Sequence, residues 1–127
     1  MAAQTPGKER QWADTVERVL AGIEHGLRSH IELAESPDGL FAEVDCARAS
    51  LDRQADELRR NHDDLLGQTI ALRRGLQRAA RGKVVGASSF GALCQRAEEL
   101  SAGLLQSDEA ETRLILESIN TDIGTGD

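Results

Sequence analysis

A few polar side chains fall at positions where the surrounding helical pattern is apolar. His62 and Glu111 continue rows of apolar residues spaced three and four apart, and Ser107 lies one helical turn before Glu111. If the two segments pack antiparallel about a turn near residue 84, His62 faces Ser107 and lies one turn from Glu111. An imidazole and a carboxylate at such a place can bind a transition metal. They can equally form a buried polar contact that fixes helix register, and both interpretations remain open for this pair of candidate ligands.

The other two histidines are predicted to lie apart from this pair. His30 continues the apolar row of its own segment, but a turn at Pro37 places it opposite about residue 44, far from His62. We therefore predict that His30 lies near a helix end, where it either caps backbone carbonyls or packs on the turn. His25 falls off the apolar row and is predicted to be exposed. His62 and Glu111 are then the only two ligands left at the site, and two ligands hold a transition metal poorly, because a structural zinc site uses four.

No catalytic motif accompanies these residues. Cys46 and Cys94 lie far apart, and neither has a histidine partner in the pattern, so nucleophilic catalysis has no support. The Glu-x-x-His motif of di-iron bundles and the glycine-rich phosphate loop are both absent. We predict a protein that is not an enzyme and carries no cofactor. Its cysteine usage and the lack of a signal-like or membrane-spanning stretch predict a cytoplasmic location.

The elements that must position these side chains are predicted to be three long helices. The chain has 39% hydrophobic and 2% aromatic residues, and good helix formers dominate its 127 residues. Helices are expected over 8–35, 39–81 and 89–120, joined by turns at Pro37 and at 82–86. The expected fold is a single all-α, up-down bundle, with four helices if the second breaks near Cys46–Ser50. Residues 1–8 and 121–127 are expected to be flexible.

Each expected helix has one apolar row that predicts its buried face. The first row is Trp12, Val16, Val19, Ile23, Gly26, His30 and Leu33; the second runs from Phe41 through Leu58, His62, Leu65 and Leu72 to Leu76; the third runs from Phe90 through Leu93, Leu100, Ser107 and Leu114 to Ser118. The second helix is longer than the first. Its excess leaves Leu40, Phe41 and Val44 without cover, which predicts a homo-oligomer or a protein partner.

The charge distribution argues against nucleic acid as the partner. The net charge is −7, and residues 84–127 carry two basic and eight acidic side chains. Five basic residues cluster just before this acidic segment: Arg73, Arg74, Arg78, Arg81 and Lys83. Cations near a helix C-terminus offset the helix dipole, and the alternative is a site for phosphate or an acidic partner.

Two stretches of the sequence resemble motifs of hemerythrin-like, or HHE cation-binding, domains. Asn61-His62-Asp63-Asp64-Leu65-Leu66 is similar to the first-helix motif, in which a histidine is followed by apolar residues. Ser107-x-x-x-Glu111-x-x-Leu114-Ile115-Leu116 resembles the next motif, His-x-x-x-Glu before an apolar triplet. Shorter stretches at 30–32, 36–40 and 122–127 also resemble bacterial proteins of this kind. The resemblance implies a helical bundle with His62 and Glu111 as two ligands.

The departures from the family pattern concern the metal site. Ser107 stands where the motif has histidine, and the ligands of the family's third and fourth helices have no counterpart after residue 120. We therefore predict a divergent hemerythrin-like bundle that has no complete di-iron site, does not bind oxygen reversibly and acts through protein contacts. The alternative is a binder of a cation or small ligand, with a site completed across a dimer.

Overall fold

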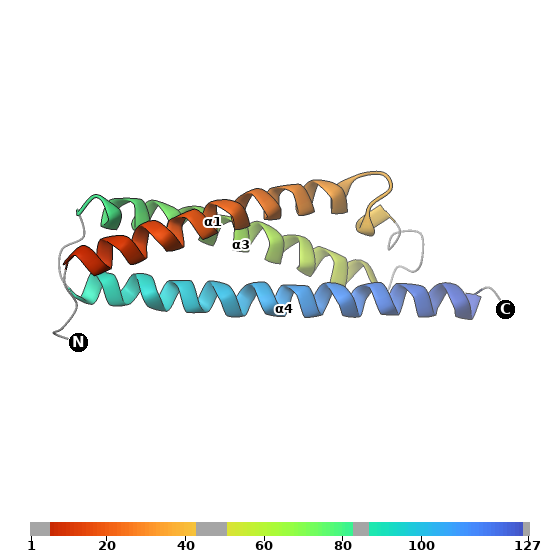
Figure 1. Ribbon diagram of the computed structural model, residues 1–127. Helices are drawn as coiled ribbons and strands as arrows, with labels where there is room; N and C mark the ends of the chain where they lie inside the picture. Colours follow the sequence, from red (N-terminus) through yellow and green to blue (C-terminus); the bar gives the residue numbers. More distant parts are fainter. Residues whose placement is uncertain (1–5, 43–50, 83–86, 126–127) are drawn as a thin grey trace.

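Three helices make up nearly all of the described part of the chain. The computed structural model describes residues 6–42, 51–82 and 87–125, with α1 at Pro6–Glu35, α3 at Asp52–Ala80 and α4 at Ala87–Thr125. Within these ranges there is no strand, and the helices run up, down and up with the two termini at opposite ends (Figure 1). The predicted all-α bundle is confirmed.

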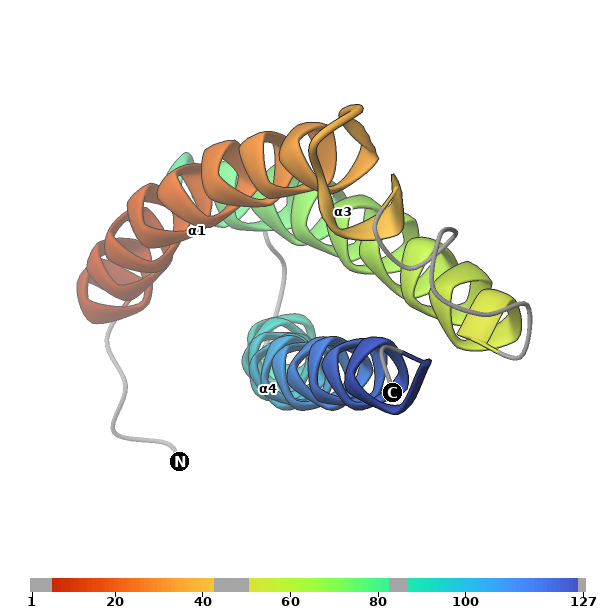
Figure 2. The same cartoon turned by 90° about the vertical axis from the view of Figure 1, so that its right-hand side faces the viewer.

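The middle helix holds the bundle together. Both α1 and α4 pack along α3, and the view along the bundle places α3 beside α1 with α4 beneath them (Figure 2). Consecutive helices that run antiparallel bring residues from the two sides of each connection to the same level. None of the described helices is long and apolar enough to cross a membrane.

The first connection differs from the prediction. Residues 36–39 form a turn and residues 40–42 are helical, but α3 begins at Asp52 and not at residue 39. The possible break at Cys46–Ser50 lies outside the described residues. At the second connection Gly82 adopts a positive φ of 74°, the left-handed conformation that glycine tolerates best. α4 extends to Thr125, five residues past its predicted end.

The buried faces follow the predicted rows in α3 and α4, and in part in α1, where Trp12, Val16 and Ile23 pack against the core. Buried residues of α3 include Leu58, His62, Leu65, Leu72 and Leu76, and those of α4 include Phe90, Leu93, Leu100, Ser107 and Leu114. In α1, Val19 is 58% exposed and Leu33 is 68% exposed, while the next residues, Leu20 and Ala34, are buried. At these two places the buried row of α1 therefore lies one position later than predicted.

The core divides into two apolar clusters along the bundle. The larger contains eight buried residues: Ala13, Leu20, Leu65, Leu72, Leu76, Ala79, Leu93 and Leu100. The smaller contains Ala34, Phe41, Leu51, Ala55, Leu58 and Leu114. Phe41 is thus buried, and the prediction that it lacks cover is wrong, because the turn after α1 folds it onto the start of α3.

Charged side chains join α1 to α3 beside the larger cluster. The Arg73 guanidinium donates hydrogen bonds to Glu17 Oε1 at 2.7 and 3.0 Å and to Glu24 Oε1 at 2.8 Å. These bonds hold the pKa of both carboxyl groups below the ordinary value. Arg73 therefore has a structural partner within the fold, while Lys83 of the same basic group lies outside the described residues.

Candidate metal centre

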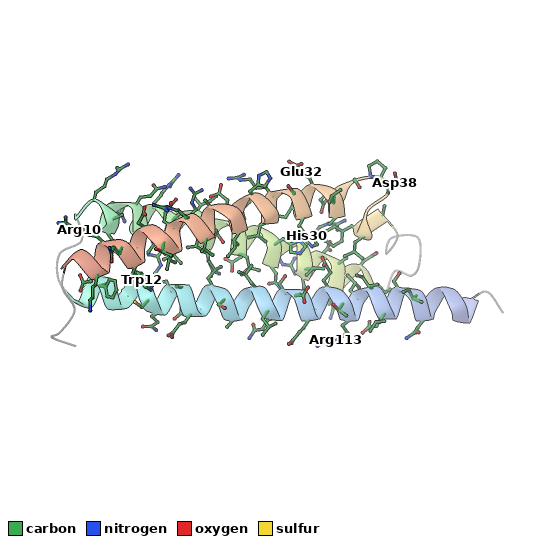
Figure 3. The ribbon with its side chains drawn as sticks, in the orientation of Figure 1. Arg10, Trp12, His30, Glu32, Asp38 and Arg113 are labelled. Atoms are coloured by element: carbon green, nitrogen blue, oxygen red, sulfur yellow. The ribbon has the colours of Figure 1, made fainter. Side chains whose placement is uncertain are left out.

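One polar layer separates the two apolar clusters, and all three helices contribute to it. His62 lies in α3 between Leu58 of the smaller cluster and Leu65 of the larger one. His30 enters from α1 and Glu111 from α4; Figure 3 shows His30 in the space between α1 and α4. Each residue continues the buried stripe of an amphipathic helix, so ordinary helix packing brings the three side chains together.

The three side chains are close enough to share one ion. His30 Nε2 lies 2.6 Å from Glu111 Oε1, and His62 Nε2 lies 3.7 Å from the same oxygen. The two imidazole rings meet edge to face with centroids 5.2 Å apart. One ligand atom from each residue lies within 4.8 Å of the others. Among the described residues, this is the group of histidine, cysteine and carboxylate side chains that could hold a metal.

The structure corrects the predicted place of His30. The prediction puts it far from His62 and at a helix end, but its ring contacts His62 and its Nε2 bonds to Glu111. The prediction assumes a turn centred at Pro37, whereas residues 30 and 62 are symmetric about residue 46. Because the connection between α1 and α3 covers residues 36–51, it moves the partner of His30 from residue 44 to His62. The signal in the sequence was His30 at a position on the apolar row.

The structure also describes most of the other candidate residues. His62 lies near Glu111 as predicted, and Ser107 lines the same pocket. His25 is exposed on α1. Cys94 is a partly buried free thiol whose pKa is raised by burial, which keeps it protonated and unreactive. Cys46 lies outside the described residues.

The layer opens to solvent on one side through a small pocket. The cavity has a volume of about 190 Å³ and is lined by His30, His62, Glu111, Ser107, Asp108 and the leucines Leu27, Leu65 and Leu104. The side chain of His30 is 46% exposed, that of Glu111 15% and that of His62 only 4%. The buried end therefore lies at α3, and an ion or small molecule can enter from the side of α1 and α4.

His62 carries an uncompensated polar atom. Its Nδ1 is buried and has no hydrogen-bond partner among the described residues. The ring also lies near Phe41, with centroids 6.2 Å apart, and the Arg59 guanidinium lies over the phenylalanine ring, 4.3 Å from its centroid. A buried polar atom without a partner costs about 1–3 kcal/mol. Packing alone therefore favours a leucine here, and the histidine needs a reason other than stability.

The charge state of His62 follows from this environment. Burial lowers its pKa below the ordinary value of 6.5, Glu111 opposes this shift, and His30 adds to it. His62 is therefore neutral at neutral pH, with a ring nitrogen lone pair available. Neutral imidazole is the form that binds metals.

Metal-free protein is expected to lose stability as the pH falls below about 6.5, because His62 takes up its proton more readily in the unfolded chain. Because the pKa of His62 is lower in the folded chain than in the unfolded one, its titration costs no stability above about pH 6.5. The free energy of unfolding then declines as the pH falls from 6.5 toward the folded pKa. Urea titrations at about pH 7 and about pH 5.5 should show this fall in the original chain.

The variant His62→Leu provides the comparison, because it removes both the titration and the unpartnered nitrogen. Its free energy of unfolding should change less over the same range. Glu17 and Glu24, whose pKa values lie below 4.5, titrate outside this window. An equal fall in both proteins would assign the pH dependence to other groups.

Comparisons with known proteins identify no relative of this chain. No protein-family model matches the chain, and no curated protein or solved structure matches it either. The function must therefore be inferred from the geometry of the described residues.

Proposed function

We propose that this protein is a helical bundle that binds one divalent transition-metal ion per chain through His30, His62 and Glu111. The observation that carries the proposal is the convergence of two imidazoles and one carboxylate from three different helices on a space within 4.8 Å. Two histidines and one glutamate are the protein ligands of one class of zinc site in which further positions stay open. The same donor types also suit Fe²⁺ and other late divalent metals.

The distances fit a small ion after modest side-chain movement. With bonds of about 2.0–2.1 Å in tetrahedral geometry, ligand atoms lie about 3.3 Å from one another. The separation of 3.7 Å between His62 and Glu111 is near this value, and the 2.6 Å hydrogen bond between His30 and Glu111 opens slightly to admit the ion. The ion takes the place of this hydrogen bond, and because metal ligands must be deprotonated, binding is favoured by higher pH.

The arrangement provides for one ion. Three ligands of the described residues converge, whereas a di-iron centre needs more. The proposal therefore retains the hemerythrin-like resemblance for the bundle and for His62 and Glu111, adds His30, and replaces the two-metal centre with a single ion. The open coordination positions face the pocket of about 190 Å³, where water or a small ligand can bind.

Metal analysis of purified protein tests the proposal. After incubation with excess zinc and removal of free metal, we expect one zinc per chain by elemental analysis. Isothermal titration of His30→Ala, His62→Ala and Glu111→Gln should show at least about 100-fold weaker binding, because each loses one of three ligands. His25→Ala is the matched control, since this exposed histidine lies on the same helix as His30.

The outcomes separate a built site from incidental binding. Unchanged binding in His25→Ala together with loss in the three ligand variants supports the proposal. Absence of bound zinc in the original chain, or equal losses in all four variants, contradicts it. Magnesium, which prefers oxygen ligands, should not compete with zinc.

A further inference from the structure

The face of α4 turned away from the other helices carries an apolar stripe. Leu105, Leu116 and Ile119 are 62%, 55% and 49% exposed. The steps of eleven and three residues place them along one side of the helix, because eleven residues make about three turns. This side lies opposite the buried row that contains Leu100, Ser107 and Leu114. Exposed apolar side chains gathered on one helix face indicate an interface.

The sequence of this stripe is complementary to itself when read in the opposite direction. In two antiparallel helices related by a two-fold axis between residues 110 and 111, Leu105 of one copy lies opposite Leu116 of the other. The same axis brings Ile119 to the level of Ala102, which is exposed on the other flank of the stripe. Leu105 and Leu116 therefore cover one another without any change in α4.

The charges beside the stripe obey the same symmetry. Glu109 and Arg113 are exposed on one flank of the stripe, and their midpoint, residue 111, nearly coincides with the two-fold axis. Figure 3 places Arg113 on the side of α4 away from α1 and α3. Each Arg113 thus lies within one residue, about 1.5 Å, of the level of Glu109 in the second copy, which allows two equivalent ion pairs. A symmetric dimer needs this self-complementarity, in which residue i meets residue j and j meets i.

We propose that the outer face of α4 is a homodimer interface, formed by antiparallel pairing of Leu105, Leu116 and Ile119 with the same stripe of a second copy. A different protein could cover an apolar stripe, but coincidence of the apolar and ionic pairs about one axis favours a second copy of this chain. The interface is separate from the layer of His30, His62 and Glu111, because Glu111 points to the opposite side of α4. The proposal therefore stands independently of metal binding.

Sedimentation of the full-length chain tests the interface. We expect a dimer at concentrations of about 100 μM, well above a micromolar dissociation constant. Leu116→Glu should give a monomer, because it places two charges in the apolar stripe. Leu33→Glu is the matched control: Leu33 is 68% exposed on α1, outside the stripe, and its variant should remain a dimer. Circular dichroism should show the same helix content in both variants.

A charge exchange tests the antiparallel register. Arg113→Glu alone should weaken dimerisation at least about tenfold, because it opposes two glutamates across the interface. The double variant Glu109→Arg with Arg113→Glu restores opposite charges and should bring the dissociation constant back to within about threefold of the original. A strictly monomeric chain, equal effects of Leu33→Glu and Leu116→Glu, or failure of the double variant to recover would overturn the proposal.

Discussion

Zinc is expected to raise the free energy of unfolding by about 2.7 kcal/mol when its free concentration is a hundred times its dissociation constant. For a chain of 127 residues this corresponds to a rise of about 10 °C in the melting temperature. The reason is that the three ligands lie on three helices and converge only in the folded chain, so the ion binds the native state in preference to the unfolded one. A chelator should return the melting temperature to that of metal-free protein.

Glu111→Gln gives the sharpest control for this effect. Glutamine retains the shape of the side chain and can still bond to His30, but it lacks the negative charge that a metal ion requires from this ligand. The variant should fold with similar stability in the absence of metal and gain little from zinc. A zinc-induced rise equal to that of the original chain would place the stabilising ion elsewhere.

Only part of the site could be predicted from the sequence. The relative positions of its three side chains depend on two different connections between helices. The pairing of His62 with Glu111 follows from the short connection between α3 and α4, where residues 81–86 leave little freedom in helix register. The position of His30 depends on the longer connection at residues 36–51. Pro37 and Gly39 mark the start of that connection in the sequence, but they do not show where it ends.

The buried faces show the same contrast between clear and ambiguous patterns. In α3 the apolar residues form one row, and its prediction is confirmed. In α1, apolar residues occur as neighbours, Val19 beside Leu20 and Leu33 beside Ala34, so two rows compete. The buried row is the one that contains Leu20 and the small residues Ala13 and Ala34, and not the one that contains Val19 and Leu33. Alanine lets two helices approach closely, and this preference depends on the partner surface and not on hydrophobicity along one helix.

Gly39→Ala is expected to destabilise the chain by about 3–4 kcal/mol, a cost near the upper end for a single methyl group. A Cβ atom at Gly39 would collide with the backbone carbonyl oxygen of Leu33 and lie 2.6 Å from that of Ala34. Both atoms belong to the last turn of α1, so no side-chain rotation relieves the contact. Thermal and urea unfolding should measure the loss.

Gly26→Ala is the matched control in the same helix. A Cβ atom there meets nothing within 4 Å, so alanine should raise the free energy of unfolding by about 0.5–1 kcal/mol through its better helix propensity. Stability of Gly39→Ala within about 1 kcal/mol of the original chain would mean that the turn adjusts easily.

The turn at Gly39 also connects stability with the proposed metal site. Gly39, His30 and Glu111 line one groove at this end of the bundle. The amide of Gly39 donates a 2.9 Å hydrogen bond to the carbonyl oxygen of Ser36, and two residues later the chain buries Phe41 against the ring of His62. Displacing the turn therefore moves a wall of the polar layer. We expect Gly39→Ala to weaken zinc binding at temperatures where it is still folded, whereas Gly26→Ala should bind zinc as the original chain does.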